Sequence, residues 1–237
     1  GVVLPLVFPI GLGVSTSPPV KNVFDYIESL PEGTPIILSM DYDPSTEPEL
    51  SPMATALMRH AFRRHLPVVV MTLHPGGPGL ALEISEKVGK EFNAKYGVDY
   101  VFLGYKAGSS AVILSFGRDL AISYPMDYYN TPIRDLPLMK RVKTYNDVGM
   151  VITISGSTFP DAWVAYGYER YGEKIAAGVT AVMAADYYPY LQTNQMVGLI
   201  GGLKGAAEYE ALIGKPDNAV KGMDAQTIVH PVSYTHL

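Results

Sequence analysis

Two carboxylates stand close together where an apolar run of the chain ends. The stretch IILSMDYDPST, residues 36–46, is apolar up to Asp41, and Asp43 follows two residues later. Carboxylates in such a position can act as nucleophile, as general acid or base, or as ligand contacts. An aspartate before proline, as at Asp43, is also a common way to begin a turn. The sequence leaves the catalytic, binding and structural interpretations open.

Polar residues follow four further apolar runs in the same way. If these runs are parallel strands, their loops all reach one edge of the sheet, where ligands bind in such folds. We therefore expect a ligand-binding site from these residues: Asp41, Asp43, Thr72, His74, Lys106, Ser109, Ser155, Ser157 and Asp186. Structural alternatives stay open, with His74 as an ordinary loop residue and with Ser157 or Thr158 as a helix cap.

The loop GYKAGSS, residues 104–110, places glycines and Lys106 before a predicted helix, which favours an anion. It is not a Walker motif. The sequence contains no G-x-S-x-G around a serine and no G-x-G-x-x-G after the first run, which disfavours a serine hydrolase and a dinucleotide cofactor. No two histidines have metal-ligand spacing. We expect no cofactor, and the sequence identifies no metal site.

The pattern of apolar residues predicts the elements that would position these side chains. Strands are expected at 34–40, 66–73, 98–105, 148–156 and 174–183. Helices are expected to begin at Ser17, Ser51, Leu80, Ala111, Ser157 and Thr193, the last of them ending at Gly214. This alternation predicts a three-layer α/β domain, Rossmann-like or flavodoxin-like, with a mostly parallel sheet of about five strands over residues 17–214.

The composition narrows the class of protein. The chain has 237 residues, 48% of them hydrophobic and 17% charged, with a net charge of −5. Those values are typical of one folded domain. No basic stripe is present, so nucleic acid is not an expected partner. The chain has no cysteine, which excludes disulfides and thiolate chemistry.

Both ends of the chain depart from this pattern. The run GVVLPLVFPIGLGV, residues 1–14, is too short to span a bilayer, and it is either a buried extended segment or the end of a truncated membrane anchor within residues 1–16. Residues 215–231 are expected to be a linker to a missing segment. VSYTHL, residues 232–237, is similar to a translated sequencing adapter, and we expect it to be a non-native tail.

The segment GLIGGLKGAAEYE, residues 198–210, is rich in small residues. Glycine inside a helix costs about 1 kcal/mol relative to alanine, so several together indicate close backbone packing. The 198–207 helix would pack against the sheet, or against another chain in a homo- or hetero-oligomer. Lys204, Glu208 and Glu210 argue against this helix itself crossing a bilayer.

IILSMDYDPS also resembles the first motif of haloacid-dehalogenase-type phosphatases, an apolar strand followed by D-x-D. The resemblance implies that Asp41 is the nucleophile and Asp43 the general acid or base. Thr72 and Lys106 would then contact phosphate, and Asp186 would help to hold Mg²⁺. The chain departs from that pattern, because Ser45 replaces the usual threonine, Pro44 intervenes and no cap domain is inserted.

Longer strings resemble an uncharacterised family of prokaryotic proteins. These are YGVDYVFLGYKAG (96–108), GLIGGLKGAAEYE (198–210) and MDAQTIVH (223–230). The resemblance implies one α/β domain between an N-terminal membrane anchor and a C-terminal apolar segment, on an unknown side of the membrane, with no assigned activity. We expect a membrane-tethered domain that binds a small ligand or a protein partner. The alternatives are a magnesium-dependent phosphatase and a structural subunit of a membrane complex.

Overall fold

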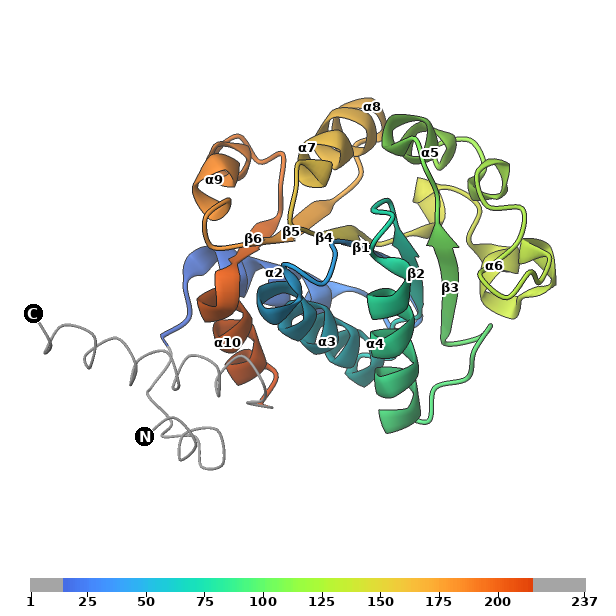
Figure 1. Ribbon diagram of the computed structural model, residues 1–237, viewed down its shortest axis with the longest axis horizontal. Coiled ribbons are helices and arrows are strands. Elements are labelled where there is room, and N and C mark those ends of the chain that lie inside the picture. Colours follow the sequence, from blue (N-terminus) through green and yellow to red (C-terminus); the bar gives the residue numbers. More distant parts are fainter. Residues whose placement is uncertain (1–14, 215–237) are drawn as a thin grey trace, which may run out of the picture.

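The computed structural model describes residues 15–214 as an α/β domain built on one sheet of six parallel strands. The strand order is β3-β2-β1-β4-β5-β6 (Figure 1). The strands are β1 (Ile36–Asp41), β2 (Val68–Thr72), β3 (Tyr100–Tyr105), β4 (Val151–Ser155), β5 (Ile175–Val179) and β6 (Gly198–Gly201). The predicted three-layer, Rossmann-like class is confirmed, with six strands where about five were expected.

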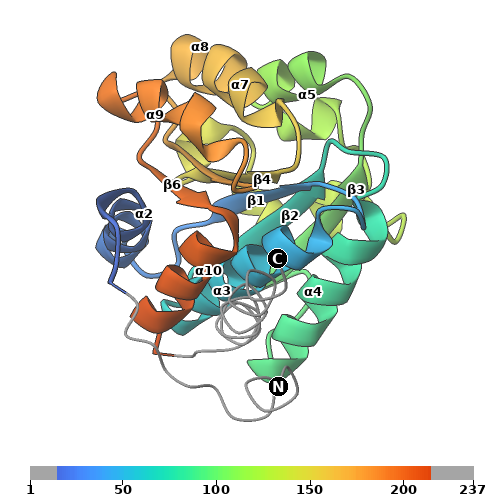
Figure 2. The same cartoon turned by 60° about the vertical axis from the view of Figure 1, so that its left-hand side comes forward.

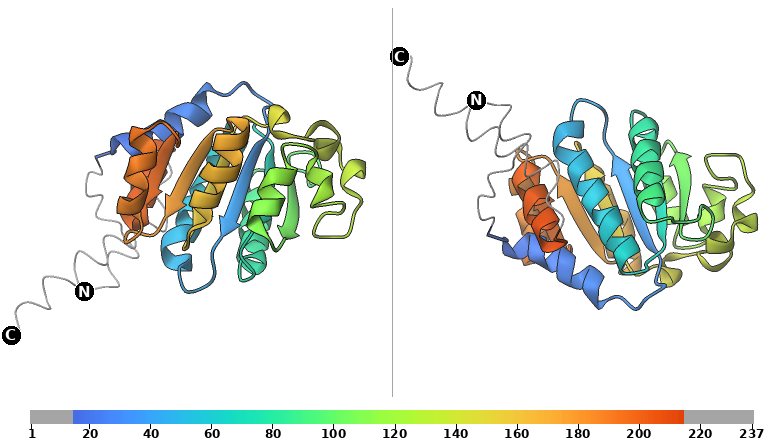
Figure 3. Two further views of the ribbon diagram at one scale, coloured as in Figure 1. Left: turned by 90° about the horizontal axis from the view of Figure 1, so that it is seen from above. Right: turned by 90° about the horizontal axis from the view of Figure 1, so that it is seen from below.

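Helices cover both faces of this sheet. One layer holds α2 (Pro18–Ser29), α3 (Glu47–Arg63), α4 (Pro78–Glu91) and α10 (Gly202–Leu212). The other holds α5 (Ser109–Ser115), α7 (Phe159–Trp163), α8 (Glu169–Tyr171) and α9 (Ala184–Gln192), with a π-turn at Val164–Tyr168 joining α7 to α8. Figures 2 and 3 show the two layers from the side and along the sheet normal. The short helix α6 (Pro137–Arg141) lies beside β3.

The strands are apolar on both faces because both faces are covered. Successive residues of β1 alternate between the two cores. Ile36, Leu38 and Met40 join the core under α3 and α4, whereas Ile37 joins the core under α5 and α7. Asp41 is therefore on the same face as Ile37 and Ser39, at the last position of a central strand.

The predicted helix from Thr193 to Gly214 is wrong over its first part. Thr193 is the C-cap of α9, and residues 198–201 form β6 beside β5. A Cβ on Gly198 would come within 2.5 Å of the Pro19 carbonyl oxygen, so the small residue lets α2 pack directly on the new strand. The turn into α10 follows at Gly202, whose φ of +60° favours glycine.

The predicted boundaries also change elsewhere. The strand expected at 174–183 ends at Val179, and α9 begins at Ala184, so Asp186 lies on a helix and not in a loop. α3 begins at Glu47 instead of Ser51, because Pro48 and not Pro52 occupies its first turn.

Most of the expected terminal features fall outside the described residues. These are the anchor end expected within residues 1–16, of which only 15 and 16 are described, the linker at 215–231 and the tail at 232–237. Over residues 15–214, the helices are all too short or too polar to cross a membrane.

Candidate functional site

A small cavity lies where the strand order reverses, at the carboxyl ends of β1 and β4. In open α/β sheets the connections leave in opposite directions at such a point, which opens a crevice between the two strands. Asp41 and Ser155 are paired at these strand ends. The cavity measures about 50 Å³, and its walls come from the loops after β1, β2 and β4. It is lined by Asp41, Tyr42, Asp43, Ser45, Thr46, His74, Gly156 and Ser157.

The loops after β2 and β4 are closed in the same way by a hydroxyl. Thr72 Oγ1 accepts a hydrogen bond from His74 N at 3.1 Å and donates to His74 O at 3.0 Å. Ser155 Oγ accepts from Ser157 N at 3.0 Å and donates to Ser157 O at 2.9 Å. Thr72 and Ser155 are both buried, so each fixes a cavity-lining residue from behind.

The loop after β1 is closed by Asp43. Its Oδ1 accepts from Ser45 N at 2.9 Å and from Ser45 Oγ at 2.5 Å, an arrangement typical of a turn-forming aspartate. The hydrogen bonds from the Ser45 hydroxyl and backbone N–H lower the pKa of Asp43. The carboxylate is therefore ionised at neutral pH, and the structural interpretation of Asp43 holds alongside its place in the cavity wall.

Three glycines let these loops touch. A Cβ on Gly77 would lie 2.3 Å from Thr72 Oγ1 and 2.7 Å from the Met40 carbonyl oxygen. A Cβ on Gly76 would lie 2.8 Å from Asp43 Cβ, and one on Gly156 would lie 2.8 Å from Thr46 Oγ1. The loops can come this close because the glycine backbone packs directly on side chains of the neighbouring loops and on the Met40 carbonyl oxygen.

Beneath the cavity, Asp41 is fully buried, and its carboxylate is hydrogen-bonded to other groups of the protein. Its Oδ1 accepts from Leu73 N at 2.6 Å and Ser39 Oγ at 2.8 Å, and its Oδ2 accepts from Thr153 Oγ1 at 3.0 Å. Burial raises the pKa of Asp41 to about 6, although these hydrogen bonds oppose the rise. The carboxylate links β1 to β4 and to the loop after β2.

Two further polar groups surround Asp41 without a hydrogen bond. The hydroxyl of Tyr124 and the indole N–H of Trp163 are buried and have no partner among the described residues. Burial, and then the charge of Asp41, raises the pKa of Tyr124. The N–H of Trp163 helps to lower the pKa of Asp41 but lies outside hydrogen-bonding geometry.

The cavity wall is rich in hydrogen-bond acceptors and contains no lysine or arginine. His74 Nδ1 accepts from Gly76 N at 3.0 Å, which assigns the proton of the neutral ring to Nε2. The hydroxyls of Ser45, Thr46 and Ser157 complete the wall. An ionised carboxylate among hydroxyls favours a cationic or donor-rich group over an anion.

The structure brings only part of the expected site together. Asp41, Asp43, His74 and Ser157 line the cavity, and Thr72 and Ser155 lie directly behind it. Lys106, Ser109 and Asp186 do not line it. Lys106 is exposed after β3, where its backbone N–H donates to Thr72 O, and Ser109 begins α5, so the loop predicted to bind an anion lies outside this cavity.

Sequence reasoning missed several participants. The lining residues not expected were Tyr42, Ser45, Thr46 and Gly156. Ser39 and Thr153, which donate hydrogen bonds to Asp41, could have been recognised in the sequence. Both are polar residues inside apolar strands, and Ser39 is two positions from Asp41, hence on the same face.

The donor set does not fit a magnesium ion at Asp41. Both oxygens of that carboxylate are occupied by N–H or O–H donors. Across residues 15–214, histidines and acidic residues nowhere form a group of three that could hold a metal.

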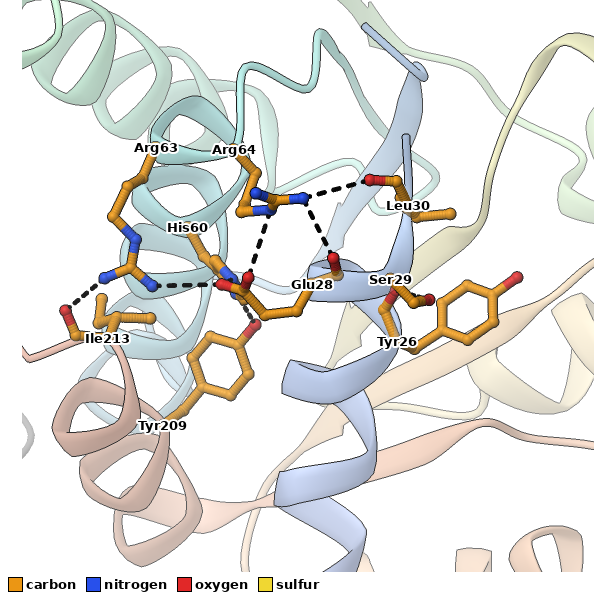
Figure 4. Close-up of polar contacts among 9 residues, drawn as sticks. All are labelled: Tyr26, Glu28, Ser29, Leu30, His60, Arg63, Arg64, Tyr209 and Ile213. Carbon is orange, nitrogen blue, oxygen red and sulfur yellow. Dashed lines mark hydrogen bonds and ion pairs between the residues drawn. The ribbon is translucent and has the colours of Figure 1, made fainter. Parts of the chain in front are cut away.

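A second polar cluster lies at another place, between α2, α3 and α10 (Figure 4). His60 is fully buried, with Nδ1 at 2.6 Å from Tyr209 Oη and Nε2 at 2.8 Å from Glu28 Oε1. Its ring stacks on Phe24 with the centroids 4.7 Å apart. Tyr209 is fully buried as well, so the His60–Tyr209 pair joins α3 to α10 and is closed to solvent.

Arg63 and Arg64 surround the same carboxylate. They lie 3.6 Å and 3.4 Å from the Glu28 oxygens. Desolvation by itself would raise the pKa of Glu28, but His60 and the two arginines together lower it. Burial lowers the pKa of His60, which keeps the ring neutral between Tyr209 and Glu28.

The chain was compared with models of protein families and with curated proteins, and neither comparison gave a match.

Proposed function

We propose that residues 17–214 form a non-catalytic binding module that holds an amine or another donor-rich group at the carboxyl edge of its sheet. The observation that carries this proposal is the cavity between β1 and β4, at the point where ligands bind in open α/β folds. Its wall offers the ionised Asp43, several hydroxyls and the ring of His74, with no lysine or arginine.

The size of the cavity supports recognition of one functional group. Ligand pockets in proteins typically measure roughly 300–1,000 Å³, and this one measures about 50 Å³. A primary amine fits such a space, while the rest of the ligand would lie on the surface outside. The side chain of a lysine on a partner protein ends in the same group. The same contacts would therefore hold either a small amine or a lysine of a partner protein.

The proposal is tested by titrating the ¹⁵N-labelled domain with ethanolamine and, separately, with ethylene glycol, which lacks the amine. We expect ethanolamine to shift the amide signals of Ser45, Thr46, His74 and Ser157 in a saturable way. Asp43→Asn should abolish the saturable shifts because it removes the carboxylate charge. Glu32→Gln, an exposed change in the loop before β1, is the matched control and should leave them in place.

Equal shifts with ethylene glycol would contradict recognition of an amine. The proposal also fails if no amide of these three loops responds to ethanolamine at millimolar concentration in the correctly folded domain.

The phosphatase alternative draws on the position of Asp41 and Asp43 at the end of β1. Three observations argue against it: Asp41 is buried, both of its oxygens already accept hydrogen bonds, and Lys106 does not line the cavity. Hydrolysis of an aryl phosphate in the presence of Mg²⁺, abolished by Asp41→Asn without loss of folding, would favour the enzyme over the binding module.

A membrane tether and a role in a larger complex are proposed from the sequence alone. The tether is supported by the apolar residues 1–14 and by the resemblance to membrane-anchored proteins. The expected contact helix at 198–207 has less support, because Gly198 and Gly201 belong to β6 and Gly202, Gly205, Ala206 and Ala207 are buried within the domain. Sequencing the uninterrupted gene and fractionating cells that express it test the tether.

A further inference from the structure

A second and much larger cavity lies in the helical layer that holds α5, α7, α8 and α9, between α5 and α8. It measures about 520 Å³, roughly ten times the cavity between β1 and β4. α5 and α8 lie next to each other in Figure 1, and the Tyr171 hydroxyl of α8 contacts the Leu114 carbonyl oxygen of α5. The groove includes Leu114 of α5, Arg118 and Ile122 of the segment that follows, and Arg170 and Tyr171 of α8.

The two arginines of this groove have no partner in the described part of the chain. Within residues 15–214, neither Arg118 nor Arg170 forms an ion pair or a side-chain hydrogen bond, whereas the five other arginines each donate to a carboxylate or carbonyl. Asp119, the acidic neighbour of Arg118 in sequence, pairs with Arg134 instead. The groove therefore presents two uncompensated guanidinium groups.

The apolar side of the groove is held in place. Tyr171 is 41% exposed, yet its hydroxyl donates to the Leu114 carbonyl oxygen at 3.0 Å and its ring lies 5.3 Å from that of Tyr145. A Cβ on Gly117 would lie 2.1 Å from the Tyr171 ring, so only glycine lets the ring lie across this loop. Ile122, 62% exposed, adds a second apolar surface.

We propose that this groove is a second binding site, for an organic anion with a flat apolar body. A carboxylate, sulfonate or phosphate group would pair with Arg118 and Arg170 through charge-assisted hydrogen bonds. The apolar body would cover Tyr171 and Ile122, and the Tyr171 ring is already held in place before binding. An inorganic anion would leave the aromatic wall uncovered, and a neutral aromatic compound would leave the two cations unpaired.

The test uses two fluorescent probes that differ by one charged group. 1-Anilinonaphthalene-8-sulfonate carries a sulfonate, and N-phenyl-1-naphthylamine has the same rings without it. We expect the sulfonate probe to bind the folded domain about tenfold more tightly than the neutral one, and more weakly as salt is raised. Arg118→Gln with Arg170→Gln should weaken the sulfonate probe about tenfold and leave the neutral probe unchanged.

Two further variants separate the charge from the aromatic wall. Lys87→Gln with Lys90→Gln removes the same charge from exposed positions of α4, on the opposite face, and should leave the affinity unchanged. Gly117→Ala keeps both arginines but displaces Tyr171, so it should weaken the sulfonate probe. Cooperative thermal unfolding of each variant confirms that the probe reports on the native state.

Three results would overturn the proposal. They are an affinity for the sulfonate probe that Arg118→Gln with Arg170→Gln leaves intact, equal affinity for the two probes, and full competition by inorganic phosphate at probe-like concentration. The last result would mean a simple anion site with no role for the apolar wall.

Discussion

The hydroxyl of Tyr209 lies 2.6 Å from Nδ1 of His60, which joins α10 to the buried side of α3. The other ring nitrogen of His60 lies 2.8 Å from Glu28 of α2. With the ring neutral, Tyr209 donates to Nδ1 and the Nε2 proton is donated to Glu28. One histidine thus connects the first and last described helices to the centre of the domain.

Tyr209→Phe tests this connection. It leaves the Nδ1 acceptor of His60 buried without a donor, so we expect the free energy of unfolding to fall by about 1–3 kcal/mol. Urea denaturation at pH 7 measures the change. Tyr128→Phe is the matched control, because that side chain is 42% exposed, and it should change stability by less than about 0.5 kcal/mol. Equal effects of the two substitutions would contradict the connection.

Asp41 should make the domain less stable as pH rises from about 4 to about 6. Its pKa is 3.8 in an ordinary environment and about 6 in the folded protein. Between those values the folded state holds a proton that the unfolded state has lost, so the free energy of unfolding falls with pH and levels off above pH 6. The expected loss is about 3 kcal/mol.

Because other carboxylates also titrate in this range, the measurement is the difference between the wild type and Asp41→Asn in urea denaturation at pH 4 to pH 7.5. The asparagine variant should gain stability relative to the wild type across this interval. A difference that does not change with pH would show that Asp41 has an ordinary pKa.

Gly77→Ala should damage the candidate site and the fold together. The new Cβ would lie 2.7 Å from the Met40 carbonyl oxygen, and backbone there cannot move away cheaply. We expect a loss of about 3 kcal/mol or more in the free energy of unfolding. Gly79→Ala is the control, because a Cβ there meets nothing within 4 Å in the first turn of α4, and it should be neutral or stabilising. Comparable thermal stability of the two variants would refute the tight approach of these loops.

Glu173 should make the stability of the domain depend on pH between about 4.5 and about 8. Its side chain is buried, and one carboxyl oxygen has no partner among residues 15–214. Burial raises its pKa from 4.5 to about 8, so the free energy of unfolding should fall as pH rises between these values. Glu173→Gln should therefore be more stable than the wild type by a few kcal/mol at about pH 8.5, and close to it near pH 4.

Thermal unfolding at both pH values checks this prediction. Glu83→Gln, at an exposed position of α4, should show no such crossover. A Glu173→Gln variant that is less stable than the wild type at high pH would mean that the ionised carboxylate is well accommodated.

Much of the fold was readable from local pattern. The apolar runs around residues 36–41, 68–72 and 151–155 are strands as predicted, because a strand covered on both faces is mostly apolar along its whole length. The segment 198–201 was misread. Four residues with two glycines carry no strand signal, and only the tertiary contacts of Gly198 with α2 and of Gly201 with Ala184 explain why these two residues are small.

The sequence predicts which edge of the sheet carries the candidate site, but it does not predict which side chains line the cavity. Parallel connections bring the ends of β1, β2 and β4 together, and Asp41, Asp43, His74 and Ser157 meet there as the strand ends suggested. The chemistry around Asp41 was not predictable in the same way. Burial of that carboxylate depends on Leu73 and Thr153, which are 32 and 112 residues away in sequence.

The sequence by itself determined the class of fold and the edge of the sheet that carries its polar loops, because strand and helix periodicity and the direction of the crossovers are local properties of the chain. Only the tertiary structure decided which polar residues share a cavity, that Asp41 is bound and buried, and that Arg118 and Arg170 face the same groove. Those facts depend on strand order and on close contacts between distant segments, and no local pattern of residues encodes such distances.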